Sequence, residues 1–239
     1  MSTFVLLHGS WHGAWCWYKI VPRLEATGHK AVAIDLPGHG RVWRRPGDVT
    51  MQDFVDAISC AIDAQDEDVV LVGHSRGGIA ITQAAEARSE RIRKLVYLAA
   101  YLIGDGETIV PYFMSDADSL IMPSLILNRD EGWDMLKREA FRDALYADCP
   151  DEDVALANTL LTPEPAAPTA TPIRTTAEGW GSVPRAYIHL RNDRAVSGTL
   201  QERMFTAMPC EQVIAMDTSH SAYFSAPDEL ARNLISLAS

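Results

Sequence analysis

The chain has 239 residues, and its 21 Lys and Arg against 32 Asp and Glu give a formal net charge of −11. Hydrophobic residues make up 47% and charged residues 22%, which is ordinary for a globular protein with a sizeable core. Binding to phosphates needs clustered Lys and Arg, so this acidic chain is a poor partner for nucleic acid or an anionic membrane.

The sequence also carries little sign of membrane insertion or export. Its longest apolar run, at residues 95–103, is too short to span a bilayer, and the first residues lack the basic segment of a signal peptide. The four Cys are scattered without CxxC spacing, which fits reduced thiols. We therefore expect a cytoplasmic protein without nucleic-acid or membrane partners, and a homodimer stays open.

Short apolar runs alternate with amphipathic stretches, and this pattern indicates βαβ units around a mainly parallel sheet. The expected strands are residues 4–7, 30–34, 69–72, 95–98, 186–190 and 212–216. The expected helices are residues 15–26, 51–64, 77–87, 198–207 and 227–237. The fold class is therefore α/β.

Residues 103–182 interrupt this alternation, and we call them the cap. They hold seven of the 13 prolines and no convincing strand, with helices expected over 135–146 and 151–161 and a loop over 162–176. An insertion here predicts a lid over the carboxyl ends of the strands, where α/β proteins bind ligands, and a core of residues 1–102 and 183–239. The cap has 15 acidic and five basic residues, which we interpret as solvated helix faces. The alternative interpretation is that the negative charge of the lid disfavours the binding of free carboxylates.

The strongest chemical signal is Gly73-x-Ser75-x-Gly77, between an expected strand and an expected helix. This is the context of a nucleophile elbow, in which a sharp turn exposes the serine hydroxyl. Such a turn strains the serine backbone and leaves space only for glycine on either side. The helix that follows supplies free backbone N–H groups for an oxyanion.

A serine nucleophile needs a base, and the base needs an acid that orients it. His220 follows the last expected strand, and Asp193 follows the strand before it. The order Ser75, Asp193, His220 is that of the α/β-hydrolases, and all three residues are expected at one edge of the sheet. Asp217 is the alternative acid, although it lies only three residues from His220.

The first strand runs into a His-Gly-Ser-Trp-His-Gly turn at residues 8–13. We assign the second half of an oxyanion hole to the Ser10 N–H, with the Arg76 N–H as its partner. The Arg76 side chain is expected to face solvent, with an anion-steering role as the alternative. His8 and His12 have a metal-ligand spacing, but glycines interrupt it, so we expect structural hydrogen bonds and no metal.

Residues 8–19, 24–30, 73–78 and 152–157, together with Asp193 and His220, resemble the plant methylesterase and hydroxynitrile lyase family over nearly the whole chain. The resemblance implies an α/β-hydrolase fold with about six strands in the order 2-1-3-4-5-6, a helical cap and a cofactor-free Ser-His-Asp site. Residues 37–40 are closer to general bacterial hydrolases, which suggests a bacterial member. Arg76 stands where plant members have an apolar residue.

The lyases of this family have Thr and Lys at two positions where this chain has Gly9 and Ser221. Gly9 is expected to leave room for an ester carbonyl, and Ser221 lacks the positive charge with which the lysine of the lyases stabilises departing cyanide. The sequence thus predicts a carboxylesterase that hydrolyses small, largely apolar esters through an acyl-enzyme, with Gly9, His12, Trp133 and Ser221 as pocket candidates. A lyase or amide-cleaving enzyme on the same triad, and a receptor with little turnover, remain the alternatives.

Overall fold

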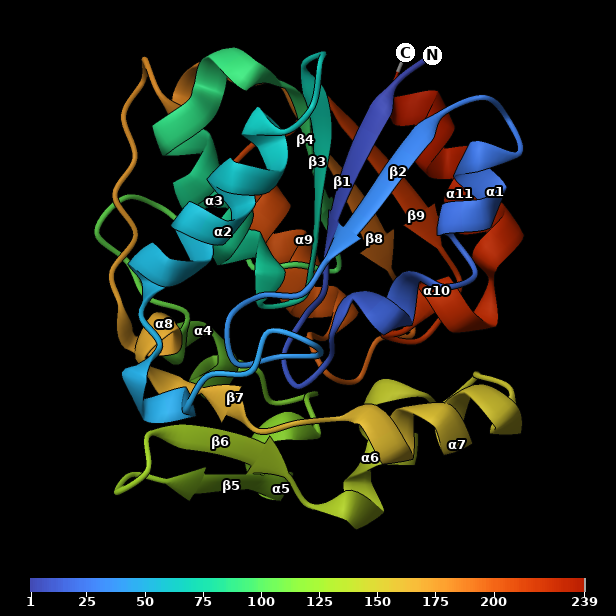
Figure 1. Cartoon of the computed structure of the whole chain (residues 1–239). Coiled ribbons are helices and arrows are strands. Elements are labelled where there is room, and N and C mark those ends of the chain that lie inside the picture. The colour runs from blue at the N-terminus through green and yellow to red at the C-terminus, as the bar shows by residue number, and fades with distance from the viewer. Residues whose placement is uncertain (239) are drawn as a thin grey trace.

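Six parallel strands form the central sheet of the structure, a computed structural model that describes residues 1–238. They are β1 (Thr3–Leu7), β2 (Lys30–Ile34), β3 (Val69–His74), β4 (Ile92–Leu98), β8 (Arg185–Leu190) and β9 (Gln212–Met216). Their order is β2-β1-β3-β4-β8-β9, which confirms the expected 2-1-3-4-5-6 order (Figure 1). Since all six run in the same direction, their carboxyl ends share one edge of the sheet, at the bottom of Figure 1.

Helices cover both faces of this sheet. They are α1 (Val21–Glu25), α2 (Met51–Asp63), α3 (Gly77–Arg88), α9 (Gly198–Ala207), α10 (Ala222–Ser225) and α11 (Pro227–Leu237). Alternate strand residues belong to two hydrophobic clusters: Phe4 of β1 packs in the cluster that contains α11, and Val5 packs in the cluster that contains α2, α3 and α9. The continuous apolar runs of the strands follow from burial on both faces.

The long helices begin and end close to where the sequence predicts. At the start of α2, the Thr50 hydroxyl accepts a hydrogen bond from the Asp53 N–H, and the Asp53 carboxylate accepts one from the Thr50 N–H. This capping box satisfies two backbone groups that the helix leaves free.

The expected helix over 15–26 is wrong, because it is divided into a 3-10 turn at Ala14–Trp17 and the short α1. Pro22 explains the break, since it lacks an N–H and fits only a first helical turn.

Most of the cap lies across the carboxyl edge of the sheet, below it in Figure 1, whereas residues 171–182 return along α3. Its helices are α4 (Val110–Ser115), α5 (Ile121–Ser124), α6 (Phe141–Leu145), α7 (Asp151–Leu160) and α8 (Ala166–Ala170), and its strands are β5 (Leu125–Asn128), β6 (Trp133–Leu136) and β7 (Glu164–Pro165). The remaining short 3-10 turns of the chain are Pro46–Asp48, Ser89–Arg91, Arg138–Ala140 and Trp180–Ser182. The division at residues 103 and 182 stays a prediction.

An antiparallel three-stranded sheet in the cap, in the order β5-β6-β7, was missed by the sequence analysis. The expected helix over 135–146 is wrong in its first part, because Met135 and Leu136 belong to β6, and the expected loop over 162–176 contains β7 and α8. Burial along β6 alternates from one residue to the next, which is the period of a strand. The helix expected over 151–161 is confirmed as α7.

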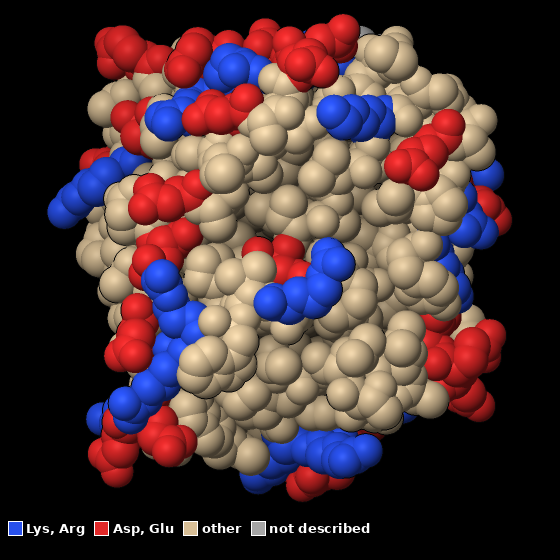
Figure 2. Space-filling model, viewed as in Figure 1, with Lys and Arg blue, Asp and Glu red and all other residues tan. Residues whose placement is uncertain are grey.

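Charged side chains are mixed on the face that Figure 2 shows. Acidic and basic residues alternate around its rim, and most of the middle is uncharged apart from one small mixed group. The acidity of the chain is therefore not gathered into a single patch on this face. Within residues 1–238, no helix has both the length and the hydropathy needed to cross a membrane.

Candidate functional site

Ser75 lies on a sharp turn between β3 and α3. Its φ of +55° falls in the left-handed region that is costly for a side chain other than glycine. The turn is held on both sides, because the Ser75 N–H donates to Leu98 O at 3.1 Å and the Tyr101 N–H donates to Ser75 O at 3.0 Å. A Cβ on Gly77 would lie 2.8 Å from the carbonyl oxygen of His8, so this position has space only for glycine. The strained turn and its glycines agree with a nucleophile elbow.

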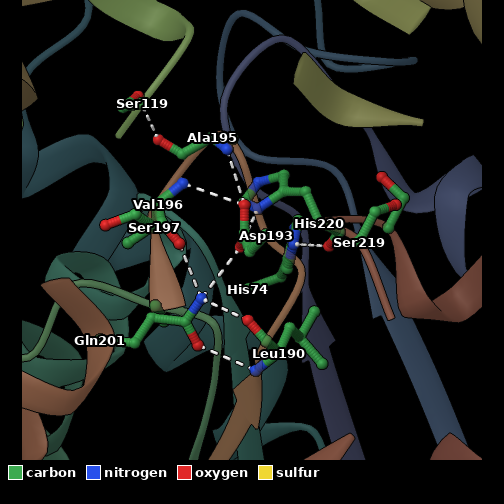
Figure 3. A network of polar contacts seen from close by, with 12 residues as sticks. His74, Ser119, Leu190, Asp193, Ala195, Val196, Ser197, Gln201, Ser219 and His220 are labelled. Atoms are coloured by element: carbon green, nitrogen blue, oxygen red, sulfur yellow. Dashed lines mark hydrogen bonds and ion pairs between the residues drawn. The ribbon is translucent and has the colours of Figure 1, made fainter. Parts of the chain in front are cut away.

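His220 and Asp193 meet at the carboxyl edge of the sheet. The distance from His220 Nδ1 to Asp193 Oδ2 is 2.7 Å, and both side chains are buried (Figure 3). A carboxylate only accepts hydrogen bonds, so Nδ1 carries the proton and Nε2 is left as the basic nitrogen. Asp217, the alternative acid, instead forms an exposed ion pair with Arg191 at 2.8 Å.

Four donors hold the Asp193 carboxylate. Oδ1 accepts the backbone N–H groups of Ala195 and Val196 at 2.7 and 3.0 Å, and Oδ2 accepts Gln201 Nε2 at 3.1 Å besides His220 (Figure 3). Gln201 comes from α9, is fully buried and also bonds both backbone groups of Leu190. The sequence analysis missed it, because a single glutamine on a helix carries no signal of a buried partner.

The loop that carries His220 is anchored at two points. His74 Nε2 donates to the His220 carbonyl oxygen at 2.9 Å, and the Ser219 N–H donates to Asp148 Oδ2 of the cap at 2.7 Å. Burial and the nearby His220 hold the pKa of the His74 imidazole well below its usual range, so the ring is neutral. His220 is therefore fixed from the core and from the cap.

A narrow pocket lies at this edge, with about 40 Å³ of space for the centres of water-sized groups. It brings together four residues predicted for the site: Ser10, Ser75, Arg76 and His220. Eight of its other lining residues are apolar or aromatic: Trp11, Tyr101, Ile109, Phe113, Ile121, Leu125, Ala195 and Val196. The remaining lining residue is Asp134. The pocket thus suits a small and largely apolar ligand.

The four pocket candidates from the sequence do not line this pocket. Gly9 packs against Ser75, since a Cβ there would lie 2.7 Å from Ser75 Cβ. The indole of Trp133 donates to Glu131 at 2.7 Å, and the neighbouring Asp134 reaches the pocket instead. Ser221 is fully buried, and its hydroxyl bonds the hydroxyl of Tyr223.

His12, the fourth of these candidates, is a structural residue. Its Nδ1 donates to Ser10 O at 2.6 Å, and its Nε2 accepts from the Tyr146 hydroxyl at 2.7 Å. His8 is equally engaged, with Gly9 O and the Leu36 N–H as partners. Burial lowers the pKa of His12 to about 3 and that of His8 to about 4. Among residues 1–238, no group of three or more His, Cys, Asp or Glu is arranged to hold a metal ion.

The Arg76 side chain does not face solvent, so that expectation is wrong. It is only 9% exposed, and its guanidinium lies 3.2 Å from Asp134 Oδ2 and 3.5 Å from Glu164 Oε1. Glu164 also contacts His39 Nε2 at 2.9 Å. Burial alone would raise the pKa of Glu164, but His39 and Arg76 outweigh it and lower that pKa to about 2. A buried cluster of charges therefore lies beside Ser75.

Comparisons with known proteins agree with this geometry. The model of the alpha/beta hydrolase family matches residues 4–233. Methylesterase 18 of Arabidopsis thaliana is 33% identical, with 99% of this chain and 97% of that protein covered. Putative methylesterase 11, chloroplastic, of the same plant is also 33% identical, and the chain spans 64% of its length. The crystal structure of polyneuridine aldehyde esterase superposes with a TM-score of 0.89 at 28% identity over 100% of both chains.

Proposed function

Because the chain belongs to the alpha/beta hydrolase family, and within it to the family of the plant methylesterases, we propose that it is a serine carboxylesterase. The observation that carries the proposal is the 2.7 Å contact between His220 and Asp193 beside a serine in the left-handed conformation. His220 and that serine line the same pocket. The relatives, which are methylesterases and polyneuridine aldehyde esterase, support the same reaction class.

In this proposal Ser75 Oγ attacks the carbonyl carbon of the ester, and its proton passes to His220 Nε2. Asp193 accepts the Nδ1–H bond, which orients the ring and stabilises the imidazolium. The bond to the alcohol then breaks, and His220 returns the proton to the leaving oxygen. A water molecule repeats the same steps on the acyl-enzyme and releases the acid and Ser75.

The oxyanion of each tetrahedral intermediate accepts the backbone N–H groups of Ser10 and Arg76. Both residues line the pocket, and within residues 1–238 neither of these N–H groups has a hydrogen-bond acceptor. Donors left free beside a nucleophile are the arrangement that an oxyanion hole requires. Arg76 stands just before α3, where free N–H groups of a helix start are found.

The proposed substrates are small, neutral and largely apolar, methyl esters among them. The largely apolar lining of the pocket supports this choice. Cys16, Cys60, Cys149 and Cys210 are all free thiols, which supports a reducing compartment such as the cytoplasm.

The test is hydrolysis of methyl and p-nitrophenyl esters by the wild type and by Ser75→Ala. We expect the variant to lose at least about 10³-fold in kcat/KM while its fold is kept. Ser59→Ala is the matched control, because Ser59 on α2 is buried to the same 7% exposure as Ser75. A fluorophosphonate probe should label Ser75 alone.

Two results would contradict the proposal. One is evidence for a different nucleophile, seen either as ester turnover by Ser75→Ala at the wild-type rate or as probe label on a different residue. The other is saturable binding of esters without turnover by the wild type, which would favour the receptor alternative. Release of cyanide from mandelonitrile above the spontaneous rate would instead favour the lyase alternative.

A further inference from the structure

Two carboxylates of the cap face each other inside the protein. Asp134 on β6 and Glu164 on β7 are direct partners in the antiparallel register, and they are only 4% and 2% exposed. Like charges directly opposite on neighbouring strands are destabilising, and burial increases that cost. Burial raises the pKa of Asp134, and Arg76 offsets this only in part. The fold tolerates two such carboxylates only because cationic and N–H groups are paired with them.

Both carboxylates bind the turn that follows β1. Glu164 Oε2 accepts the Trp11 backbone N–H at 2.9 Å, and Asp134 Oδ1 accepts the Trp11 indole N–H at 3.0 Å. Trp11 has a φ of +64°, a strained conformation that persists only where surrounding contacts impose it. Trp11 directly follows Ser10, so these contacts hold the backbone that carries the first proposed oxyanion donor.

The same carboxylates bind Arg76, whose backbone N–H is the second proposed donor. Both terminal nitrogens of its guanidinium lie within 3.2 Å of Asp134 Oδ2, and one of them lies 3.5 Å from Glu164 Oε1. Since Arg76 stands between Ser75 and the first residue of α3, holding its side chain also holds the backbone beside the nucleophile. One pair of cap residues thus contacts both loops from which the donors come.

We propose that Asp134 and Glu164 are positioning residues that set the distance between the two N–H groups of the oxyanion hole. The inference rests on the proposed esterase function, because the two N–H groups are proposed to bind the oxyanion of ester hydrolysis. Neither carboxylate takes or gives a proton in the reaction. They act through Trp11 and Arg76, so their removal should weaken the transition state more than the bound ester.

The experiment compares Glu164→Gln and Asp134→Asn with the wild type in kcat, in KM and in affinity for an arylboronic acid. Such a boronic acid forms a tetrahedral adduct on the serine that occupies the oxyanion hole. We expect kcat to fall about 10- to 100-fold, KM to change less than about threefold, and boronic acid affinity to fall with kcat. Affinity for the carboxylate product should not fall in parallel.

Asp153→Asn is the matched control. Asp153 is also a fully buried carboxylate of the cap, but its partners are Tyr18 and Lys19 of the core, away from the oxyanion hole. We expect this variant to lower the melting temperature while kcat and boronic acid affinity stay within about twofold of the wild type, because its contacts hold no oxyanion donor. Should Glu164→Gln fail to fold, Glu164→Asp keeps the charge, withdraws it by one methylene and carries the same expectations.

The inference is overturned if Asp134→Asn and the folded Glu164 variant keep the wild-type kcat. It is also overturned if Asp153→Asn loses as much kcat, or if KM rises while kcat stays constant. Failure of the proposed function has a different signature, since the wild type itself would then hydrolyse no ester and Ser75 would take no fluorophosphonate.

Discussion

Replacing Gly9 by Ala adds one methyl group at the closest approach between the two loops of the site. The new Cβ would lie 2.7 Å from Ser75 Cβ, 3.0 Å from His74 Nδ1 and 3.2 Å from the His74 carbonyl oxygen. Carbon atoms in ordinary contact are about 3.5–4.0 Å apart, so the overlap with Ser75 is roughly 1 Å. None of these three atoms is the free end of a flexible side chain.

The overlap has to be relieved by moving one of the two loops. β1 and β3 are hydrogen-bonded neighbours with Leu7 opposite Gly73, so the strands cannot separate without losing ladder bonds. We expect a shift of several tenths of an ångström to about 1 Å in either Ser10 or Ser75, and misplacement on that scale costs about 10²-fold in rate. Overpacking of a filled interior should also lower the free energy of unfolding by about 1–3 kcal/mol.

The assay is kcat/KM on a p-nitrophenyl ester together with urea unfolding. Gly104→Ala is the control, because a Cβ there meets only the end of the Glu107 side chain, at 3.1 Å, and this chain end can move aside. Wild-type activity in Gly9→Ala would refute the reasoning, since the tight contact would then impose nothing on the catalytic geometry. Equal losses in Gly104→Ala would refute it as well.

Three further predictions concern groups buried around the site. Gln201→Leu removes one hydrogen-bond donor from Asp193 and leaves the backbone N–H of Leu190 in β8 unpaired. We expect kcat to fall about tenfold and the free energy of unfolding to fall by about 1–3 kcal/mol. An unchanged urea midpoint would contradict this prediction. Burial lowers the pKa of His12 to about 3, so between pH 6.5 and 3 this residue binds more protons in the unfolded chain than in the folded one, and the melting temperature should fall steadily below pH 6.5. A melting temperature that stays constant down to pH 4.5 would rule this out. Tyr146→Phe leaves His12 Nε2 without its hydrogen-bond donor and should lower the free energy of unfolding in urea by about 1–3 kcal/mol. An unchanged free energy of unfolding would show that this bond does not form in solution.

The core could be predicted from the sequence because its signals are local and strong. Runs such as residues 69–72 are apolar throughout, as strands covered on both faces must be, and the Gly-x-Ser-x-Gly turn follows directly. The meeting of His220 with Asp193 followed from chain order alone, since both come directly after parallel strands. Their catalytic roles remain a prediction.

The cap could not be predicted in the same way, because its structure depends on contacts between distant residues. β7 has only two residues, one of them a proline that has no N–H for a ladder, so no window of sequence identifies it. Asp134 and Glu164 were predicted to be solvated, because charged residues are rarely buried. Their common partner Arg76 lies 58 and 88 positions before them in the sequence. Arg76 was misjudged for the same reason.

The pairing of Arg76 with two cap carboxylates limits how this chain can be recombined with its relatives. A cap without acidic residues at the positions of Asp134 and Glu164 would bring no carboxylate to meet the Arg76 guanidinium. The buried charge left behind would cost about 3–5 kcal/mol, a large share of the stability of a domain. A chimera with such a cap therefore has to exchange residue 76 together with the cap, although the two are far apart in the sequence.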